Sequence, residues 1–452
     1  MTVNWKKTFV ALPLSAALLV PGTTVFADDH SDHEKMENVS VSTPAADLRA
    51  TLDQALSEHA YLAVVTMQKG IDGAGDFDQA AAALEMNTGD LTEAITSVYG
   101  EEAGAQFEEM WSQHIGYFVD YVNATAEEDE AGREEALNNL DNYREDFSEF
   151  LETATEGNLE ASELAEGLQM HVDQLVGAFD NYEEGSFDEA YDQLRSSIEH
   201  MYGVGEGLST AITTQFPEDF DNTNPATPAA DLRADLNHLL SEHAALATLA
   251  MQKGGDGAED FENAAGALEA NTEDLTAAIS SVYGEDAGEE FKMMWSEHIG
   301  YFVDYVEATG EEDEEAKDEA LANLDDYRAD FSEFLDTATE GGLEAEQTAE
   351  GLQIHVNQLT GAFDSYVEGD YETTYNQVRE AYAHMYGVGE GLSSAIVDQN
   401  PEEFTDETPS EMPKTGMGGA SDQSGVNGWM IAFTSMAAAL FALVIGVRRK
   451  ES

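Results

Sequence analysis

The sequence predicts an all-α protein with two tandem helical-bundle domains, each of about three αα-hairpins, and a C-terminal transmembrane helix. Three observations lead to this prediction. Apolar residues recur at intervals of three and four, which is the period of an amphipathic helix. The stretch from Thr43 to Phe220 returns 184 residues later, from Thr227 to Phe404, without a gap. Finally, the apolar run at 429–447 is long enough to cross a bilayer.

Each predicted helix of the first repeat ends at a glycine-rich or acidic turn. The first helix carries an apolar stripe from Leu48 to Met67, and the segment GIDGAGD ends it. Further helices are predicted at 77–99, 101–125, 129–155, 159–184 and 187–215. No stretch alternates between apolar and polar residues as a half-buried strand would, which supports the all-α class.

The repeat and the two ends of the chain predict its division into segments. Residues 1–27 have the basic start (Lys6, Lys7), the apolar stretch and the small-residue cleavage site (Ala27) that are typical of a secretory signal peptide. The remaining segments are an acidic N-terminus at 28–42, the first helical domain at 43–220, a polar linker at 221–226, the second helical domain at 227–404, a second linker at 405–428, the transmembrane span at 429–447 and a basic tail at 448–452.

The second linker contains the pentapeptide MPKTG, and the apolar span and the basic tail RRK follow it. This order resembles the sorting signal of Gram-positive surface proteins, whose usual form is LPxTG. The resemblance implies that a sortase cuts after the threonine and joins it to peptidoglycan, although a methionine stands in place of the usual leucine. The alternative is that the span stays in the membrane. Either possibility places residues 28–411 outside the cell. The residues of this motif are Met412, Pro413, Lys414, Thr415 and Gly416.

The composition excludes several classes of function. With 93 acidic and 18 basic residues, the net charge of −75 argues against nucleic-acid binding through a basic face. An acidic surface with few lysines resembles halophile proteins, because salt screens the self-repulsion, and we expect a salt-adapted host. A surface that attracts cations is a compatible alternative. The absence of cysteine from the sequence excludes disulfides, thiolate nucleophiles, cysteine-ligated zinc, iron–sulfur clusters and c-type haem.

Histidines on apolar helix faces are the predicted metal ligands. The first three of each repeat follow one another at 55 and 57 residues. Burial favours the neutral imidazole, which can bind a metal ion. The alternative is that each is a core residue bonded to a backbone carbonyl or a carboxylate. The candidates are His59, His114, His171 and His200, with His243, His298, His355 and His384 in the second repeat.

Methionines near these histidines favour copper, since soft sulfur selects Cu(I). Histidine and methionine can also hold haem iron, and another transition metal is a further alternative. Methionine is equally an ordinary core residue. Cleavage after Ala27 would make His30 the third residue, which resembles the amino-terminal motif that binds copper and nickel. The candidate methionines are Met67, Met110, Met201, Met251, Met294 and Met385.

Catalytic motifs are absent from the sequence, and three helix-weakening glycines require another explanation. There is no H-E-x-x-H, P-loop or G-x-S-x-G, and no glutamate stands three residues before a repeated histidine as in di-iron bundles. An enzyme is therefore the less favoured class. Gly203, Gly205 and Gly207 recur in the second repeat, which indicates either close helix packing or access to a planar ligand.

Four segments of the first repeat resemble a helical repeat found in secreted Firmicutes proteins, some of which carry the label copper amine oxidase-like. They are SEHAYLAVVTMQKG, MWSQHIGYFVDYV, LQMHVDQLVGAFDNY and HMYGVGEGLS, and the resemblance covers both repeats. We therefore expect a cell-wall-anchored surface protein that binds copper, another transition metal or haem in each domain, with sortase and peptidoglycan as partners. The alternative is a structural or adhesive stalk without a ligand. The sequence leaves the oligomeric state open.

Overall fold

The computed structural model describes residues 39–405 and confirms the all-α prediction, since twelve α-helices and no strand occur in this range. The first repeat forms α1 (Pro44–Ile71), α2 (Phe77–Tyr99), α3 (Glu101–Ala126), α4 (Glu130–Ala154), α5 (Ala161–Glu183) and α6 (Phe187–Gln215). The second repeat forms α7 (Pro228–Asp256), α8 (Phe261–Tyr283), α9 (Glu285–Gly310), α10 (Glu314–Ala338), α11 (Ala345–Glu368) and α12 (Tyr371–Gln399). A short 3-10 turn follows each repeat, at Pro217–Phe220 and Pro401–Phe404.

Local sequence signals explain where these helices begin and end. The Thr43 side chain accepts a hydrogen bond from the backbone N–H of Ala46, and a proline follows at the first helical position, so α1 starts with a full cap. Gly100 alone separates α2 from α3. Its φ of 85° lies in the region that favours glycine, which lets the chain reverse within one residue.

The first helix of each repeat is its central helix. α1 contacts α2, α3, α5 and α6, and α7 makes the equivalent contacts in the second repeat. Every residue from Leu56 to Lys69 is buried, so this part of α1 is enclosed on all sides. The hairpin pairs α1–α2, α3–α4 and α5–α6 also pack together, as the sequence predicts. Residues that point from α3 and α5 towards α1 therefore meet in the middle of the repeat.

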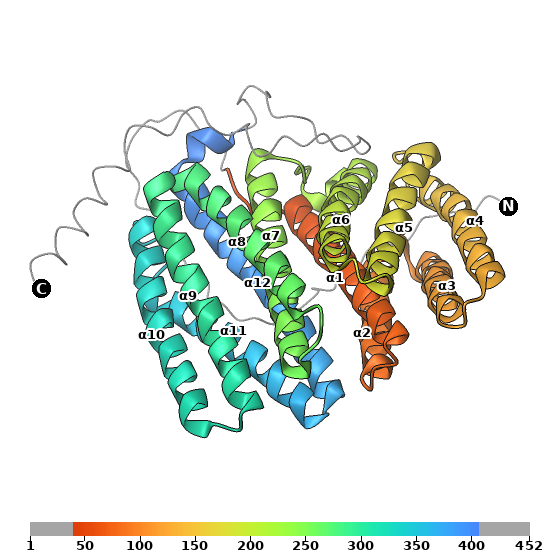
Figure 1. Cartoon of the computed structure of the whole chain (residues 1–452). Coiled ribbons are helices and arrows are strands. Elements are labelled where there is room, and N and C mark those ends of the chain that lie inside the picture. Colours follow the sequence, from red (N-terminus) through yellow and green to blue (C-terminus); the bar gives the residue numbers. More distant parts are fainter. Residues whose placement is uncertain (1–38, 406–452) are drawn as a thin grey trace, which may run out of the picture.

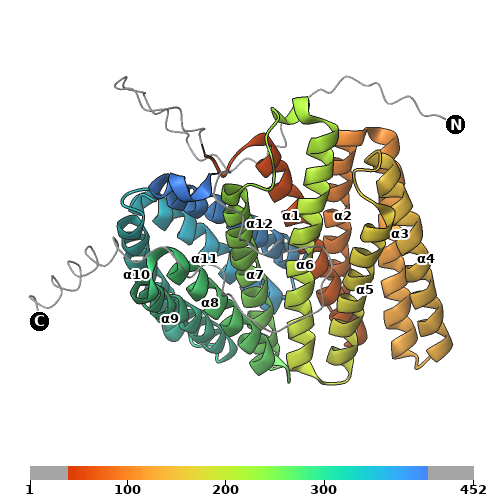
Figure 2. The ribbon, with the colours of Figure 1, turned by 90° about the horizontal axis from the view of Figure 1, so that it is seen from above.

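The two repeats lie side by side (Figures 1 and 2), the first in red to yellow and the second in green to blue. Helices α1, α6, α7 and α12 lie between them, while α3–α4 and α9–α10 lie at the outer edges. One hydrophobic cluster includes residues of both repeats, among them Tyr61 and Tyr382, whose rings stack at 6.2 Å. The core is thus continuous from one repeat to the other.

Buried lysines reinforce the contact between the repeats. Lys69 pairs with Asp76 of its own repeat at 2.8 Å and donates to Tyr366 of the second repeat. Lys253 makes the same two contacts with Asp260 and Tyr182. Both lysines keep a carboxylate partner, which is what a charge requires when it is taken out of water.

The expected ends of the chain lie outside the described residues. This applies to the signal peptide at 1–27, to His30, to the MPKTG motif and to the apolar span at 429–447. Among the helices within 39–405, none has the length and apolar character required to cross a membrane.

Candidate metal centre

Three of the predicted histidines of the first repeat meet at one point. α1 contributes His59, α3 contributes His114 and α5 contributes His171. One ring nitrogen of each lies within 4.8 Å of the others. The Nε2 atoms of His59 and His114 are 3.3 Å apart. The spacing of 55 and 57 residues places each histidine on the first helix of its hairpin, and α3 and α5 both pack against α1.

This geometry suits a single transition-metal ion. Nitrogen ligands of zinc lie about 2.0–2.1 Å from the ion, so two ligands of a tetrahedral site are roughly 3.3 Å apart. The Nε2 atoms of His59 and His114 already have this separation. The third nitrogen lies within 4.8 Å of the other two, so its ring would have to move closer by up to about 1.5 Å to complete the set.

The second repeat builds the same arrangement from His243, His298 and His355. The ring centroids of His243 and His298 are 5.4 Å apart, against 5.3 Å for His59 and His114. The ring centroids of His243 and His355 are 5.9 Å apart, against 5.8 Å for His59 and His171. The two triads are therefore equivalent sites.

Burial keeps all six imidazoles neutral. Their exposed fractions range from 0% for His59 to 6% for His355. Because the charged form is disfavoured away from water, the pKa of every triad histidine is lowered from its ordinary value, and that of His114, His298 and His355 falls to about 3. The neighbouring imidazoles lower the pKa of several of them further. At neutral pH each ring thus offers a lone pair.

Several of these nitrogens lack protein partners. Within the described residues, neither ring nitrogen of His171 or of His243 has a hydrogen-bond partner. A buried polar group left in this state costs about 1–3 kcal/mol, and such groups are rare in folded proteins. Coordination of a metal ion would use one lone pair of each ring, so the donor set fits an ion.

Aromatic rings surround the triad. Trp111 lies 4.8 Å from His59 and 4.6 Å from His114, between ring centroids. Tyr143 of α4 stacks on His114 at 4.9 Å. Tyr327 stacks on His298 at 4.8 Å in the same way. These tyrosines were not predicted as part of the site, although their recurrence in both repeats, at the same place in α4 and α10, was a signal for them.

The fourth histidine of each repeat is outside the triad. Nε2 of His200 is 3.0 Å from the carbonyl oxygen of Gly167, and Nε2 of His384 is 3.0 Å from that of Gly351. Both are therefore core histidines that bond to a backbone carbonyl. This role was the alternative to metal binding for every candidate histidine. His200 nevertheless lines a small cavity of about 70 Å³ together with His114 and His171.

The predicted methionines lie around the triad or further along the helices. Met67 follows His59 by eight residues on α1, about 12 Å along the helix axis. Met201 lines the small cavity beside His171, and Met110 is half-buried. In the second repeat Met251 and Met385 are buried and Met294 is half-buried. The structure thus joins three of the seven ligand candidates of each repeat at one point.

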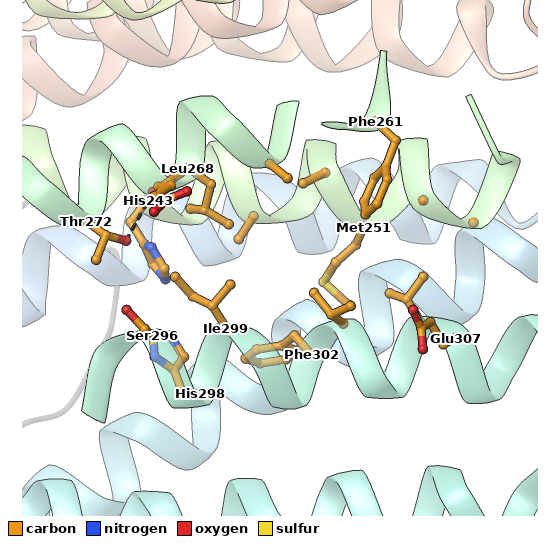
Figure 3. A pocket seen from close by; sticks show the side chains of 18 of the residues that line it. His243, Met251, Phe261, Leu268, Thr272, Ser296, His298, Ile299, Phe302 and Glu307 are labelled. Carbon is orange, nitrogen blue, oxygen red and sulfur yellow. Dashed lines mark hydrogen bonds between the residues drawn. The ribbon is translucent and has the colours of Figure 1, made fainter. Parts of the chain in front are cut away.

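A cleft adjoins the second triad. It has a volume of about 660 Å³ and is lined by residues of α7, α8 and α9. Figure 3 shows His243 and His298 at one end, while Met251 lies further along, between Phe261 and Phe302. The equivalent cavity of the first repeat holds about 90 Å³.

Comparison of the chain with known protein families, with curated proteins and with solved structures finds no match. Its function must therefore be argued from the site itself, because a fold alone does not imply one.

Proposed function

We propose that the protein is a surface protein that binds two transition-metal ions, one in each repeat. Three imidazoles hold each ion, from His59, His114 and His171 in the first repeat and from the equivalent triad in the second. The observation that carries the proposal is the convergence of three buried, neutral imidazoles within 4.8 Å, found twice. The role of the protein is to bind or sequester metal outside the cell.

An ion fits this donor set better than haem does. In haem the four porphyrin nitrogens fill the plane around the iron, so the protein supplies at most two axial ligands on opposite faces. Three nitrogens that converge on one point leave no room for a ring between them. The proposal therefore sets haem aside in favour of an ion.

Copper is the favoured metal. For a given set of nitrogen ligands the affinity of divalent ions is highest for Cu²⁺, above that for Zn²⁺. Within the described residues, neither triad includes a carboxylate that would offset the charge of the ion. A buried charge is costly, so the single charge of Cu(I) suits three neutral ligands in aromatic surroundings. Zinc is the competing metal, since three histidines also form zinc sites.

The proposed location rests on the sequence of the two ends. A signal peptide at 1–27 would export the chain, and sortase would join Thr415 to peptidoglycan, or the span at 429–447 would hold the chain in the membrane. The net charge of −75 attracts cations to the surface and suits a salt-adapted Gram-positive host.

A structural stalk is the second candidate. The observation that favours it is the distance of 3.3 Å between Nε2 of His59 and Nε2 of His114, which also suits a hydrogen bond between two core histidines. A stalk of this kind would contain no metal, and measurement of metal content separates the two functions.

The test is elemental analysis of residues 28–411, purified in high salt, stripped with a chelator and then dialysed against equal copper and zinc. Every protein in the test carries His30→Ala, because the expected amino-terminal motif would bind a further copper ion. We expect two copper ions per chain, one after His171→Ala or His355→Ala, and none after both. His200→Ala is the matched control and should retain two.

Three results would count against the proposal. An intact chain that retains no metal would favour the stalk, as would a double variant that retains two ions. Two zinc ions in place of copper would overturn the choice of metal while the site remains.

A further inference from the structure

The cleft of the second repeat leads from the surface to the metal ligands. His243 and His298 line its inner end, and His355 is not among its lining residues, so the cleft approaches the triad from the side away from that third ligand. Phe261, Phe302 and other apolar side chains form its walls. Its volume of about 660 Å³ lies within the range of about 300–1,000 Å³ that small-molecule sites occupy.

The two repeats have diverged at this place. The second repeat has the smaller residue at three positions that line the wide cleft. Ala250 stands in place of Thr66, Gly255 in place of Ile71, and Gly310 in place of Ala126. The cavity of the first repeat is only about 90 Å³. Because the triads themselves are equivalent, the difference lies in access to the ion and not in the ligands.

Three imidazoles leave one position of a tetrahedral ion free. In the second repeat this position can face the cleft, because two of the three ligands line it. In the first repeat only His59 of the triad lines the narrow cavity. An external molecule can therefore reach the second ion more easily than the first.

The charges along the cleft favour an uncharged ligand. Glu269, Glu307 and Glu311 line the cleft and are exposed. Lys292 is the basic residue of the lining, and its ammonium pairs with Glu273. Anions would thus meet carboxylates, and a cation would have to leave water to enter the apolar interior.

We propose that the second repeat binds an uncharged small molecule with an apolar body and one terminal nitrogen or oxygen donor. Its body lies between α7, α8 and α9, and its donor atom takes the open position of the ion held by His243, His298 and His355. This inference rests on the proposed function, since the donor atom requires a metal ion. The first repeat holds its ion without such a ligand.

The probe is 4-phenylimidazole at pH 8, where it is uncharged, and the measurement is calorimetric titration of the chain loaded with two ions. 1-Phenylpyrrole, which has the same shape without a free donor atom, is the matched ligand control. We expect one phenylimidazole per chain and at least tenfold weaker binding of phenylpyrrole. Metal content is determined before and after each titration.

Paired substitutions locate the probe. Ala250 and Thr66 are equivalent, buried at 7% and 4% exposure, and line the wide and the narrow cavity. Ala250→Leu should weaken phenylimidazole binding at least tenfold with two ions still bound, and Thr66→Leu should leave it unchanged. Ala265→Leu, at a half-buried position of α8 in the same lining, is a second variant in case Ala250→Leu disturbs the fold.

The results separate this inference from the proposed function. A chain that holds two ions but binds no phenylimidazole, or binds two, would overturn the inference and leave metal binding intact. Equal affinity for phenylimidazole and phenylpyrrole would do the same. A loss of phenylimidazole affinity with Thr66→Leu and not with Ala250→Leu would also overturn it. A chain that binds no metal would refute the proposed function, and the inference with it.

Discussion

Arg195 in α6 donates hydrogen bonds from Nε and Nη2 to the two carboxylate oxygens of Glu242 in α7, at 3.1 and 3.0 Å. Arg379 in α12 makes the same contact with Glu58 in α1, at 3.0 and 2.9 Å. The two pairs are equivalent: in each, an arginine from the last helix of one repeat contacts a glutamate in the first helix of the other. The two repeats therefore meet through the same surface, as subunits of a two-fold dimer do. Each glutamate directly precedes a triad histidine. The contact between the repeats thus fixes the segment of the central helix that carries a triad histidine.

The first prediction concerns the loss of one arginine from this interface. In the Arg379→Met variant, Glu58 remains buried at 4% exposure and keeps only the amide of Asn87 as a hydrogen-bond donor. Burial raises the pKa of this carboxyl, while its contacts with Arg379 and Asn87 lower it, so the charged form loses its main partner in the variant. Breaking a buried pair in this way costs about 3 kcal/mol. Urea unfolding at neutral pH measures the loss.

The symmetry of the interface supplies the controls. Arg195→Met should cost a similar free energy, because it leaves Glu242 in the same state. The double variant Arg379→Met with Glu58→Gln should recover most of the loss, since no unpaired charge remains. A cost below about 0.5 kcal/mol for Arg379→Met would contradict the prediction, because only exposed pairs are so weak.

Much of the fold could be predicted from local sequence signals. The predicted helices at 77–99 and 187–215 match α2 and α6 at both ends, and those at 101–125, 129–155 and 159–184 differ from α3, α4 and α5 by no more than two residues at either end. Glycine-rich and acidic turns mark these ends clearly. The contact between the repeats was not predictable in this way, because Arg195 and Glu242 belong to different repeats and carry no local pattern.

The site could be predicted in part. Apolar neighbours marked His59, His114 and His171 as buried, and their spacing placed them on equivalent helices. His200 was added because it also recurs in the second repeat, but its partner is the carbonyl oxygen of Gly167. Sequence periodicity assigns a residue to a helix face but does not give its distance from residues of other helices. Methionines such as Met67 could therefore not be separated from the histidines that converge.

The second prediction distinguishes two glycines of α6. A Cβ atom at Gly205 would overlap Oδ1 of Asp53 and lie 3.2 Å from its backbone nitrogen, so α6 approaches α1 closely at this point. Gly205→Ala should therefore destabilise the protein by about 1–3 kcal/mol. At Gly203, which is exposed, a Cβ atom would meet nothing within 4 Å. Gly203→Ala should stabilise the protein by up to about 1 kcal/mol, because alanine favours the helix.

Thermal unfolding of the two variants tests this explanation of the repeated glycines. A similar stability change in both would show that helix propensity alone explains them. Gly389→Ala in the second repeat should behave as Gly205→Ala does, since its Cβ atom would overlap the side chain of Asn237.

The third prediction concerns Asp53, which has no exposed surface. Burial raises the pKa of its carboxyl well above the ordinary value, although Arg49 at 3.7 Å opposes the shift. A carboxyl with a raised pKa binds its proton more readily in the folded state than in the unfolded state. Its contribution to stability is therefore complete below about pH 4 and is lost as the pH rises through the raised pKa.

The second repeat indicates the substitution to make, because asparagine occupies the equivalent position, Asn237. Asp53→Asn removes the titrating group, while Arg49 keeps Asp231 and Glu206 as partners. The variant should match the unchanged protein near pH 4 and exceed its stability by about 1–2 kcal/mol at pH 8. Asn237→Asp adds a buried carboxyl to the second repeat, so its stability should fall further below that of the unchanged protein as the pH rises. Urea unfolding of all three proteins between pH 4 and 8 gives the answer, and parallel curves over this range would show that burial of Asp53 does not control its charge.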